Sequence, residues 1–463
     1  MSMERIKIIS KTESLCPRCL KKIGAQIQTQ GSKTYMVKCC PEHGIFKTAI
    51  WKGSISIDKW VRKKERAYIK NPSTAIEKGC PFDCGLCSEH RQHTCTALIE
   101  VTQNCNLYCS FCFADSNGCK EKEPDLEEIE LQYKSVLKVS GKCNIQLSGG
   151  EPTVRNDLPV IIKMGTELGF SFIQVNTNGL RMGEDESYVK ELKEAGLSSI
   201  FLQFDGTDDA INIKLRGREL LEVKIKAIEN CKKYDIGVVL VPTLVPEINL
   251  NNIGSIIDFA LEYAPTVRGV HFQPVSYFGR IPSVPMDKDR VTLPEIMEAI
   301  EDQTAGKIKK DSLKPPGCEN ALCSFHGSYL LEGKNKLMNI TNRSKCSCEK
   351  EKAEKGAEKT KAYVSRNWSY RKIDQLKERG NTSELGEWEE ILHRIYKHSF
   401  SISAMAFQDV WNIDLERVKD CCIHVVSSDG RLIPFCMYNL TDMEGRYLYR
   451  KRNETEEPSP LSR

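Results

Sequence analysis

The sequence lacks the features that mark several other classes of protein. No stretch approaches the ~20 consecutive apolar residues of a membrane-spanning helix, and Met1 to Ser10 carry charges instead of the apolar run of a signal peptide. Its 67 basic and 63 acidic side chains nearly cancel, leaving a net charge of +4, which argues against a protein that wraps nucleic acid and against a disordered acidic chain. We expect a folded cytoplasmic protein with no nucleic-acid partner and a large core over its 463 residues.

Cysteine is the residue type that the sequence has in excess. Of 21 cysteines, twelve precede residue 120, Cys143 and Cys231 alone occupy the long middle interval, and seven lie between Cys318 and Cys436. In a reducing compartment, closely spaced thiols bind metals or do redox chemistry more often than they form disulfides. The odd count also disfavours a disulfide framework. The distribution therefore predicts metal centres at the two ends of a catalytic core.

Short β-rich runs alternate with longer helical patterns between Thr96 and Pro274, which is typical of parallel β/α units. The expected strands are 98–101, 144–147, 172–176, 199–204, 237–241 and 269–272. The expected helices are 126–139, 158–168, 186–194, 220–233 and 253–263. This pattern predicts an α/β fold with a partial, TIM-like (β/α)6 barrel over residues 98–285. In such a barrel the functional groups gather at the carboxyl ends of the strands.

The segments around this core divide the rest of the chain. We predict a small Cys-rich metal module at residues 12–52 and a linker with an auxiliary-cluster segment at 53–97. A C-terminal auxiliary-cluster region is predicted at 286–440, before a polar tail at 441–463. Residues 349–380 are dense in Lys and Glu, which favours a solvated helix supported by intrahelical ion pairs.

The strongest motif consists of Cys105, Cys109 and Cys112, directly after the first predicted strand. Three thiolates at spacings of four and three residues hold three irons of a 4Fe-4S cluster and leave the fourth iron open to a ligand. A zinc knuckle is the alternative, and it would need Cys119 as its fourth ligand.

Polar groups follow the next three predicted strands. The second strand ends in Gly149, Gly150, Glu151 and Pro152. There, backbone without side chains lets a ligand approach closely, and a carboxylate can meet an ammonium group. The third and fourth strands end in Asn176, Asn178, Gln203 and Asp205. They predict a binding site at the barrel mouth, although Asn-Gly and Asp-Gly are also ordinary turn pairs. Arg216 is either an anion partner or a solvated helix cap.

The cysteine motif, with Phe111 before its last cysteine, resembles that of the radical S-adenosylmethionine (SAM) superfamily, and the resemblance covers the β/α core. It implies that the open iron binds the amino and carboxylate groups of SAM, and that an electron from the cluster splits SAM into methionine and a 5'-deoxyadenosyl radical. The Gly-Gly-Glu-Pro segment would then meet the SAM amino group, and the other polar groups the ribose, the carboxylate and the substrate. An external electron donor, such as a ferredoxin or flavodoxin, is the implied partner.

Cys80, Cys84 and Cys87 repeat the four-then-three spacing, and Cys95 follows. Four thiolates close a cluster completely, so these residues predict an auxiliary 4Fe-4S centre instead of a second SAM site. A structural zinc site with the same four ligands is the alternative.

Cys16 and Cys19 form one pair of candidate ligands, and Cys40 and His43 form a second pair after an interval of twenty residues. This is the ligand spacing of a small zinc or rubredoxin-like module that holds one Fe or Zn ion. Cys39 competes with Cys40, which we prefer because a proline follows it, as one follows Cys16.

A third cluster is predicted from C-terminal thiols whose spacing is not diagnostic by itself. Its candidate ligands are Cys318, Cys323, Cys421 and Cys436. Cys422 competes with Cys421, while Cys346 and Cys348 are left unassigned. Buried free thiols are the alternative.

Together the motifs resemble one branch of the superfamily, that of archaeal tetraether lipid synthase, whose members are also described as 7,8-dihydro-6-hydroxymethylpterin methyltransferases. The shared segments are Cys-Pro-x-Cys, Cys-Pro-Glu-His-Gly, the doubled Cys-x3-Cys-x2-Cys, Gly-Val-Val-Leu-Val-Pro-Thr and Pro-Phe-Cys-x-Tyr-Asn. The resemblance implies that a radical joins isoprenoid lipid tails by carbon-carbon bond formation. The alternatives are methylation of a pterin precursor and, from another class, an iron-sulfur electron carrier or scaffold.

A lipid substrate would also require contact with a membrane surface. The basic residues from Lys59 to Lys70, with Trp51 and Trp60, could dock on anionic headgroups. A linker helix packed on the core is the interpretation that we favour for this stretch.

Overall fold

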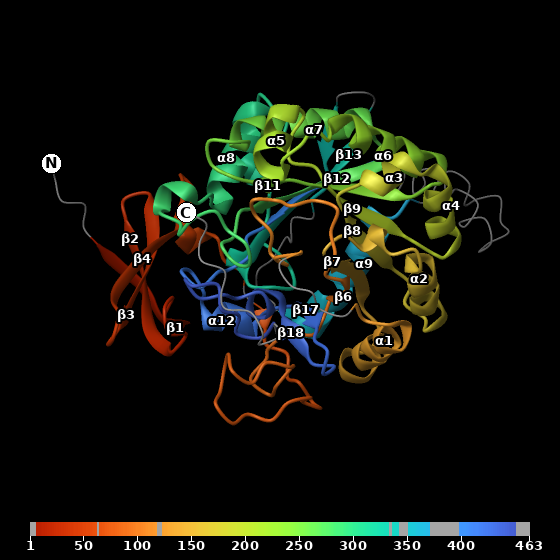
Figure 1. Cartoon of the computed structure of the whole chain (residues 1–463). Coiled ribbons are helices and arrows are strands. Elements are labelled where there is room, and N and C mark those ends of the chain that lie inside the picture. The colour runs from red at the N-terminus through yellow and green to blue at the C-terminus, as the bar shows by residue number, and fades with distance from the viewer. Residues whose placement is uncertain are drawn as a thin grey trace, which may run out of the picture.

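The computed structural model describes residues 6–62, 64–117, 123–332, 336–341, 351–370 and 398–450. Cys119, Cys346 and Cys348, together with most of the tail, lie outside these residues. A small sheet at the edge of the molecule adjoins one long curved sheet with helices along its outer face (Figure 1).

The N-terminal module is a four-stranded antiparallel sheet in the order β1-β2-β3-β4. Its strands are β1 (Lys7–Leu15), β2 (Lys22–Gln30), β3 (Lys33–Cys40) and β4 (Gly44–Lys52). Lys38 of β3 fastens this sheet to the C-terminal part of the chain. Its buried ammonium donates to Leu15 O at 2.8 Å, Ser14 Oγ at 3.1 Å and Val410 O at 2.5 Å. Burial lowers the pKa of Lys38 to about 7, because an ammonium loses its hydration there.

All six expected strands of the α/β core are present and lie parallel to their neighbours, which confirms the predicted fold class. They are β6 (Thr96–Thr102), β7 (Asn144–Gly149), β8 (Ile173–Thr177), β9 (Ser199–Gln203), β10 (Gly237–Val241) and β12 (Val267–Pro274). The short β11 (Thr243–Leu244) pairs with β12.

The helices on the outer face also follow the expected pattern. They are α1 (Leu126–Ser140), α2 (Leu158–Glu167), α4 (Glu186–Glu194), α6 (Leu221–Lys233) and α7 (Ile253–Glu262), with the additional α3 (Leu180–Glu184), α5 (Asp209–Arg216) and α8 (Leu293–Gln303). Ile145 and Leu147 of β7 and Ile200 and Leu202 of β9 are buried in the main hydrophobic core. Since successive strand residues face opposite ways, the residues between them face the lumen.

C-terminal strands extend both edges of the core sheet, which sequence patterns did not predict. On one side, β16 (Ser399–Met405) runs parallel to β12 and is followed by β13 (Ser324–Leu331) and β14 (Leu337–Asn339). On the other side, β17 (Ile423–Val426) runs parallel to β6 and pairs with β18 (Leu432–Pro434). The short helices α12 (Leu415–Lys419) and α13 (Phe435–Tyr438) flank β17 and β18 in the chain.

Helix α9 (Ala353–Trp368) corrects the expectation of a solvated helix within residues 349–380. It lies across the amino ends of the core strands: Asn144 Nδ2 donates to Lys361 O at 3.3 Å, and Arg268 Nε donates to Asn367 O at 3.0 Å. Before it, β15 (Glu351–Lys352) pairs with β5 (Lys64–Glu65). The helix therefore covers the end of the barrel opposite Cys105. The part of the predicted stretch beyond Tyr370 lies outside the described residues.

The two tryptophans before and within the basic stretch are buried, as in a linker that packs on the core. Trp51 and Trp60 are 3% and 7% exposed, and their indole N–H groups donate to Ile55 O and Ala321 O. Their rings therefore pack on the core and are not available to insert among headgroups. Within the described part of the chain, no helix has the length and apolar character that crossing a membrane requires.

Candidate active site and metal centres

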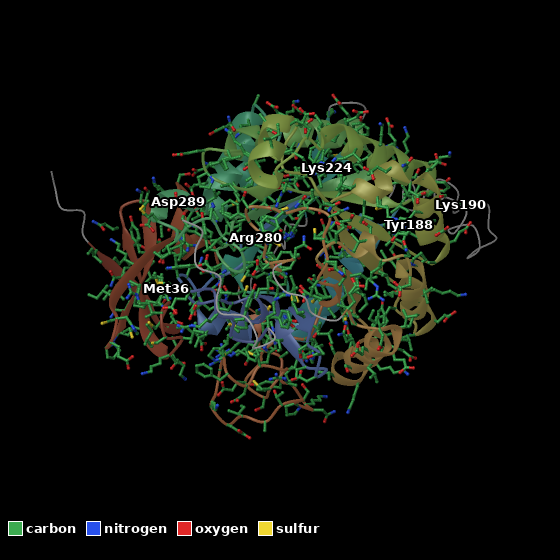
Figure 2. The ribbon with its side chains drawn as sticks, in the orientation of Figure 1. Met36, Tyr188, Lys190, Lys224, Arg280 and Asp289 are labelled. Carbon is green, nitrogen blue, oxygen red and sulfur yellow. The ribbon has the colours of Figure 1, made fainter. Side chains whose placement is uncertain are left out.

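The loop after β6 carries Cys105, Cys109 and Cys112, all of which line one large cavity. Arg280, which follows β12, holds this loop in place (Figure 2). Its Nε donates to Cys109 O at 2.9 Å, its backbone pairs with that of Cys112, and its guanidinium lies 3.9 Å from the ring centre of Tyr108. The three thiols are therefore fixed between the carboxyl ends of β6 and β12, at opposite sides of the barrel mouth.

Gly149 and Gly150 pack directly on the chain that leads into Cys105. Gly150 N donates to Thr102 O at 2.8 Å, and Glu151 N donates to Asn104 O at 2.8 Å. A Cβ on Gly149, whose φ is +121°, would lie 2.1 Å from Thr102 O, and one on Gly150 would lie 2.1 Å from Asn104 O. Only glycine fits these two positions, so the Gly-Gly segment and the cysteine loop form one unit.

The Glu151 carboxylate is buried and is already used by protein donors. Oε1 accepts from Thr153 N at 3.1 Å, Thr153 Oγ1 at 2.6 Å and Thr177 Oγ1 at 2.7 Å, while Oε2 accepts from Asn178 N at 2.7 Å. Burial raises the pKa of Glu151, although these donors oppose the rise. These contacts join the ends of β7 and β8, and the carboxylate also lines the cavity, so its expected meeting with an ammonium group stays a prediction. Pro152 begins a buried turn and does not line the cavity.

Asp205 and Arg216 form a buried ion pair beside the cavity. Arg216 Nε and Nη2 donate to the two oxygens of Asp205 at 2.7 and 2.9 Å, and Thr243 N donates to Asp205 at 2.9 Å. Although burial opposes it, Arg216 holds the pKa of Asp205 below its ordinary value. Arg216, and not Asp205, lines the cavity. Arg216 was expected to be either the partner of an anion or a solvated helix cap. The structure fits the first interpretation, because Arg216 is buried and the anion that it binds is the Asp205 carboxylate.

The cavity fills the lumen between the cysteine loop and α9 and has a volume of about 2270 Å³. Polar side chains face it from successive strands: Gln146, Ser148, Asn176, Gln203, His271 and Gln273. Asn176 Nδ2 donates to Ser148 Oγ at 3.2 Å, whereas its buried Oδ1 has no partner among the described residues. A buried acceptor left open in this way fits a ligand hydroxyl group, such as that of a ribose.

An aromatic group lies on the α9 side of the lumen. The rings of Phe201 and His271 stack with centres 5.5 Å apart, and Trp368 of α9 lies 4.8 Å from Phe201. Burial lowers the pKa of His271 to about 4, so its imidazole is neutral at pH 7, and Nδ1 is 2.8 Å from Ser403 Oγ. Sequence reasoning missed these lumen residues. Polar or aromatic residues at every second position of otherwise apolar strands could have indicated which side chains face the lumen.

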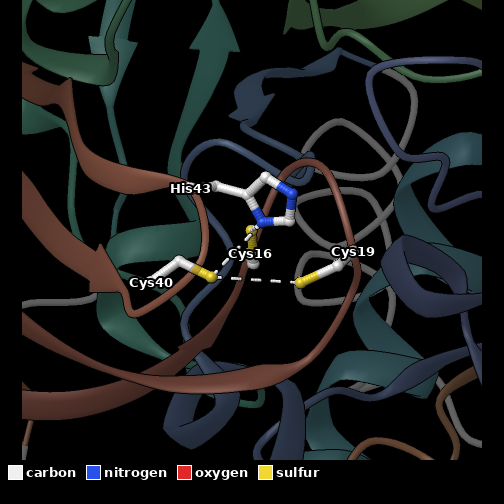
Figure 3. Close-up of side chains that lie close together, drawn as sticks. All are labelled: Cys16, Cys19, Cys40 and His43. Atoms are coloured by element: carbon white, nitrogen blue, oxygen red, sulfur yellow. Dashed lines mark hydrogen bonds between the residues drawn. The ribbon is translucent and has the colours of Figure 1, made fainter.

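The N-terminal module brings Cys16, Cys19, Cys40 and His43 together (Figure 3). His43 Nδ1 lies 3.6 Å from Cys16 Sγ and 3.5 Å from Cys40 Sγ, and the sulfurs of Cys19 and Cys40 are 4.0 Å apart. Metal-ligand bonds of ~2.0–2.3 Å place tetrahedral ligands roughly 3.5–3.8 Å apart. The set therefore has the size of a mononuclear site. Donors from His43 and the backbone outweigh burial and lower the pKa of Cys40 to about 6.

Replacing Cys40 by Ala should remove this metal, whereas replacing Cys39 by Ala should not. Cys39 is exposed and lies outside the four-residue set, while Cys40 is buried within it. Metal analysis of the two variants, side by side with the unchanged protein, checks the difference, and the Cys39 variant serves as the control for an adjacent thiol. Equal metal content in both variants would contradict the choice of Cys40.

Cys95, Cys318 and Cys422 form a second compact set, which corrects the expected grouping of two of them. All three are buried with sulfurs within 4.8 Å of one another, and the Sγ atoms of Cys95 and Cys318 are 2.7 Å apart. Cys95 was expected with Cys80, and Cys318 with Cys323. The pairing of β17 with β6 instead places Cys422 beside Cys95, whose N–H donates to Cys422 O at 2.8 Å. This set lies at the amino end of β6.

The remaining candidate ligands form two looser groups. Cys80, Cys84 and Cys87 line a small separate cavity. Burial raises the pKa of Cys84, and the nearby thiols Cys80, Cys87 and Cys421 raise it further. Burial is the main cause that raises the pKa of Cys421, and the nearby thiols Cys436 and Cys323 raise it further. Arg417 Nη2 donates to Cys323 Sγ at 3.4 Å. Neither group is among the compact sets that fit a single ion, and thiolates are the usual protein ligands of a 4Fe-4S cluster.

Comparisons with known proteins agree with this arrangement. The sequence model of the radical SAM superfamily matches residues 99–260, and that of the HMPTM N-terminal zinc ribbon domain matches residues 8–52. The chain is 37% identical to a 7,8-dihydro-6-hydroxymethylpterin dimethyltransferase of Methanocaldococcus jannaschii, over 93% of each chain. A probable GTP 3',8-cyclase of Sulfolobus acidocaldarius is 29% identical over 35% of this chain and 50% of its own. Streptococcus suis SuiB bound to precursor peptide SuiA has a TM-score of 0.39 at 18% identity, over 47% of each chain.

The fold, the cysteine loop and the sequence matches define a radical SAM enzyme, which uses SAM and a 4Fe-4S cluster and has cysteine sets that fit auxiliary metal centres. Within that superfamily, the chain belongs to the family of the Methanocaldococcus jannaschii dimethyltransferase.

Proposed function

We propose that the protein is a radical SAM methyltransferase that acts on a reduced pterin of the 7,8-dihydro-6-hydroxymethylpterin type. The observation that carries this proposal is the polar lumen, where amide side chains from β7, β8, β9 and β12 and a neutral imidazole face the cavity. Asn176 Oδ1 has no partner among the described residues, so a hydrocarbon tail there would leave this buried acceptor unpaired, at a cost of about 1–3 kcal/mol. A pterin instead offers alternating donors and acceptors on a flat ring. The similarity to a named pterin dimethyltransferase supports the same substrate.

The residues of this chain would prepare the site for a radical, which bound SAM supplies when an external donor, such as a ferredoxin or flavodoxin, reduces the cluster. Cys105, Cys109 and Cys112 would hold that cluster. Gly149 and Gly150 let the end of β7 pack closely on the chain that leads into the cysteine loop, and Asn176 offers an open acceptor to a ligand hydroxyl.

Carbon-carbon joining of isoprenoid lipid tails is the second candidate, and the size of the cavity favours it. A volume of about 2270 Å³ exceeds the roughly 300–1,000 Å³ of most small-molecule pockets. A bare pterin would leave much of this space to water or to another part of the substrate.

The two candidates predict different products. Anaerobically reconstituted protein with SAM and dithionite should form 5'-deoxyadenosine faster when 7,8-dihydro-6-hydroxymethylpterin is added, and mass spectrometry should detect pterin that has gained one or two methyl groups. A diether phospholipid in detergent serves as the comparison substrate. An unchanged pterin together with a lipid product that has lost hydrogen and gained a tail-to-tail bond would reject the methyltransferase and support the second candidate.

A further inference from the structure

Three of the four basic residues of α9 lie on the face that lines the cavity, while the fourth, Lys361, donates to Lys142 O. Lys355, Lys359 and Arg366 line the cavity and are spaced four and seven residues apart, so they lie within roughly 40° of one another around the helix. Glu354 and Glu358 of the same helix are not among the lining residues, and Glu354 lies 4.0 Å from His93 instead. A helix that is merely solvated does not need this separation of charge.

Further cations reach the same part of the cavity from other segments. Lys310 and Lys314 line it close to α8, with Lys310 Nζ 3.1 Å from Ser54 Oγ and Lys314 Nζ 2.7 Å from Asp311 O. Arg62 lines it beside Gly317. Among the described residues that line the cavity, the acidic ones are Glu151, Asp311 and Glu319. Since Glu151 is at the far end, the α9 end has a clear excess of positive charge.

We infer that the α9 end of the cavity is a subsite for a phosphoryl group, so that the substrate carries a phosphate ester or diphosphate on an arm. Lysine ammonium groups and an arginine fork are the side chains that best match phosphate oxygens. The site lies one strand length from the cysteine loop, because β7 runs six residues, or roughly 20 Å, from its contact with α9 to Gly149. The substrate must therefore be longer than a pterin ring, which also accounts for the cavity volume. The assignment of the ring to the SAM end rests on the proposed function.

Binding of pyrophosphate tests the subsite without any catalysis. Reconstituted full-length protein should bind labelled pyrophosphate in equilibrium dialysis, and Lys355→Gln and Arg366→Gln should each weaken this binding about tenfold, the effect of losing ~1.4 kcal/mol. Both side chains are exposed to the cavity, so these variants should fold. Lys190→Gln is the matched control, because Lys190 lies on the outer surface of α4, paired with Glu194 (Figure 2). Equal affinity in all four proteins would overturn the subsite.

A comparison of substrates then shows whether the phosphoryl group belongs to a pterin or to a lipid. With 7,8-dihydro-6-hydroxymethylpterin diphosphate, Lys355→Gln should raise KM about tenfold and leave kcat nearly unchanged, while KM for the unphosphorylated pterin should not change. If neither pterin reacts but a short-chain phospholipid displaces pyrophosphate, the proposed function fails and the subsite stands with a lipid headgroup. If the pterin reacts equally well with and without the diphosphate in every variant, the subsite fails and the proposed function stands.

Discussion

Replacing Cys105, Cys109 or Cys112 by Ala should lower the formation of 5'-deoxyadenosine by on the order of 1,000-fold or more. Each of these thiols would hold one iron of the cluster, and a cluster that has lost one of its three protein ligands no longer presents a single open iron to SAM. The measurement is anaerobic SAM cleavage with dithionite, quantified by chromatography. Metal analysis should find the ion of the N-terminal module retained, since its ligands lie on a separate sheet.

Cys231→Ala is the matched control for this experiment. Cys231 is fully buried on α6 and belongs to neither of the compact sets, so its loss removes packing alone, worth about 1 kcal/mol. SAM cleavage should then be close to that of the unchanged protein. If a Cys105 variant cleaved SAM as fast as the Cys231 variant, the assignment of the catalytic cluster to this loop would be wrong.

The sequence predicts those parts of the fold that local patterns determine. The core strands and helices were found because apolar residues recur with the period of each element, as in β7 and α1. The loop with Cys105 was found because its ligands are neighbours in the chain. The site in the N-terminal module was found for the same reason, since its two pairs have fixed internal spacing and antiparallel strands bring them together.

Other parts of the site depend on contacts between distant segments. Cys95 and Cys318 are 223 positions apart and meet only because β17, β6 and α9 converge. No spacing rule covers such a distance, so sequence reasoning grouped each of these thiols with its nearest neighbours in the chain. The orientation of α9 is a second case. The spacing of Lys355, Lys359 and Arg366 is visible in the sequence, but an exposed helix and a helix facing a polar cavity show the same pattern.

The polar lumen depends both on a local sequence pattern and on contacts between distant segments. Gln146 and Ser148 alternate with apolar residues in β7, as Gln174 and Asn176 do in β8. In the structure, Gln146 Nε2 donates to Gln174 Oε1 at 2.8 Å, and Gln174 Nε2 donates to Ser199 Oγ at 3.2 Å. Alternation predicts that these residues share a face. Alternation cannot tell whether this face lines an internal cavity or lies on the solvent-exposed surface, because that depends on the closure of the barrel.

Replacing Cys318 by Ala should remove the metal of one auxiliary centre. The double variant with both Cys318→Ala and Cys95→Ala should have the same metal content as the single variant. Cys95, Cys318 and Cys422 lie within one compact set, so losing any member disables the same site, and their effects cannot add. Iron, zinc and sulfide analysis of the single and double variants measures this. Because metal binding also contributes to folding, the free energy of unfolding should fall by the same amount in the single and double variants.

Cys323→Ala provides the contrast, because Cys323 contacts Arg417 and lies near Cys421 and Cys436 instead. The grouping from the structure predicts that Cys318→Ala and Cys323→Ala remove metal from different centres, so that their double variant loses both amounts. The grouping from sequence spacing predicts one shared centre and no additional loss. A double variant with the metal content of either single variant would therefore restore the sequence-based grouping and reject the set formed by Cys95, Cys318 and Cys422.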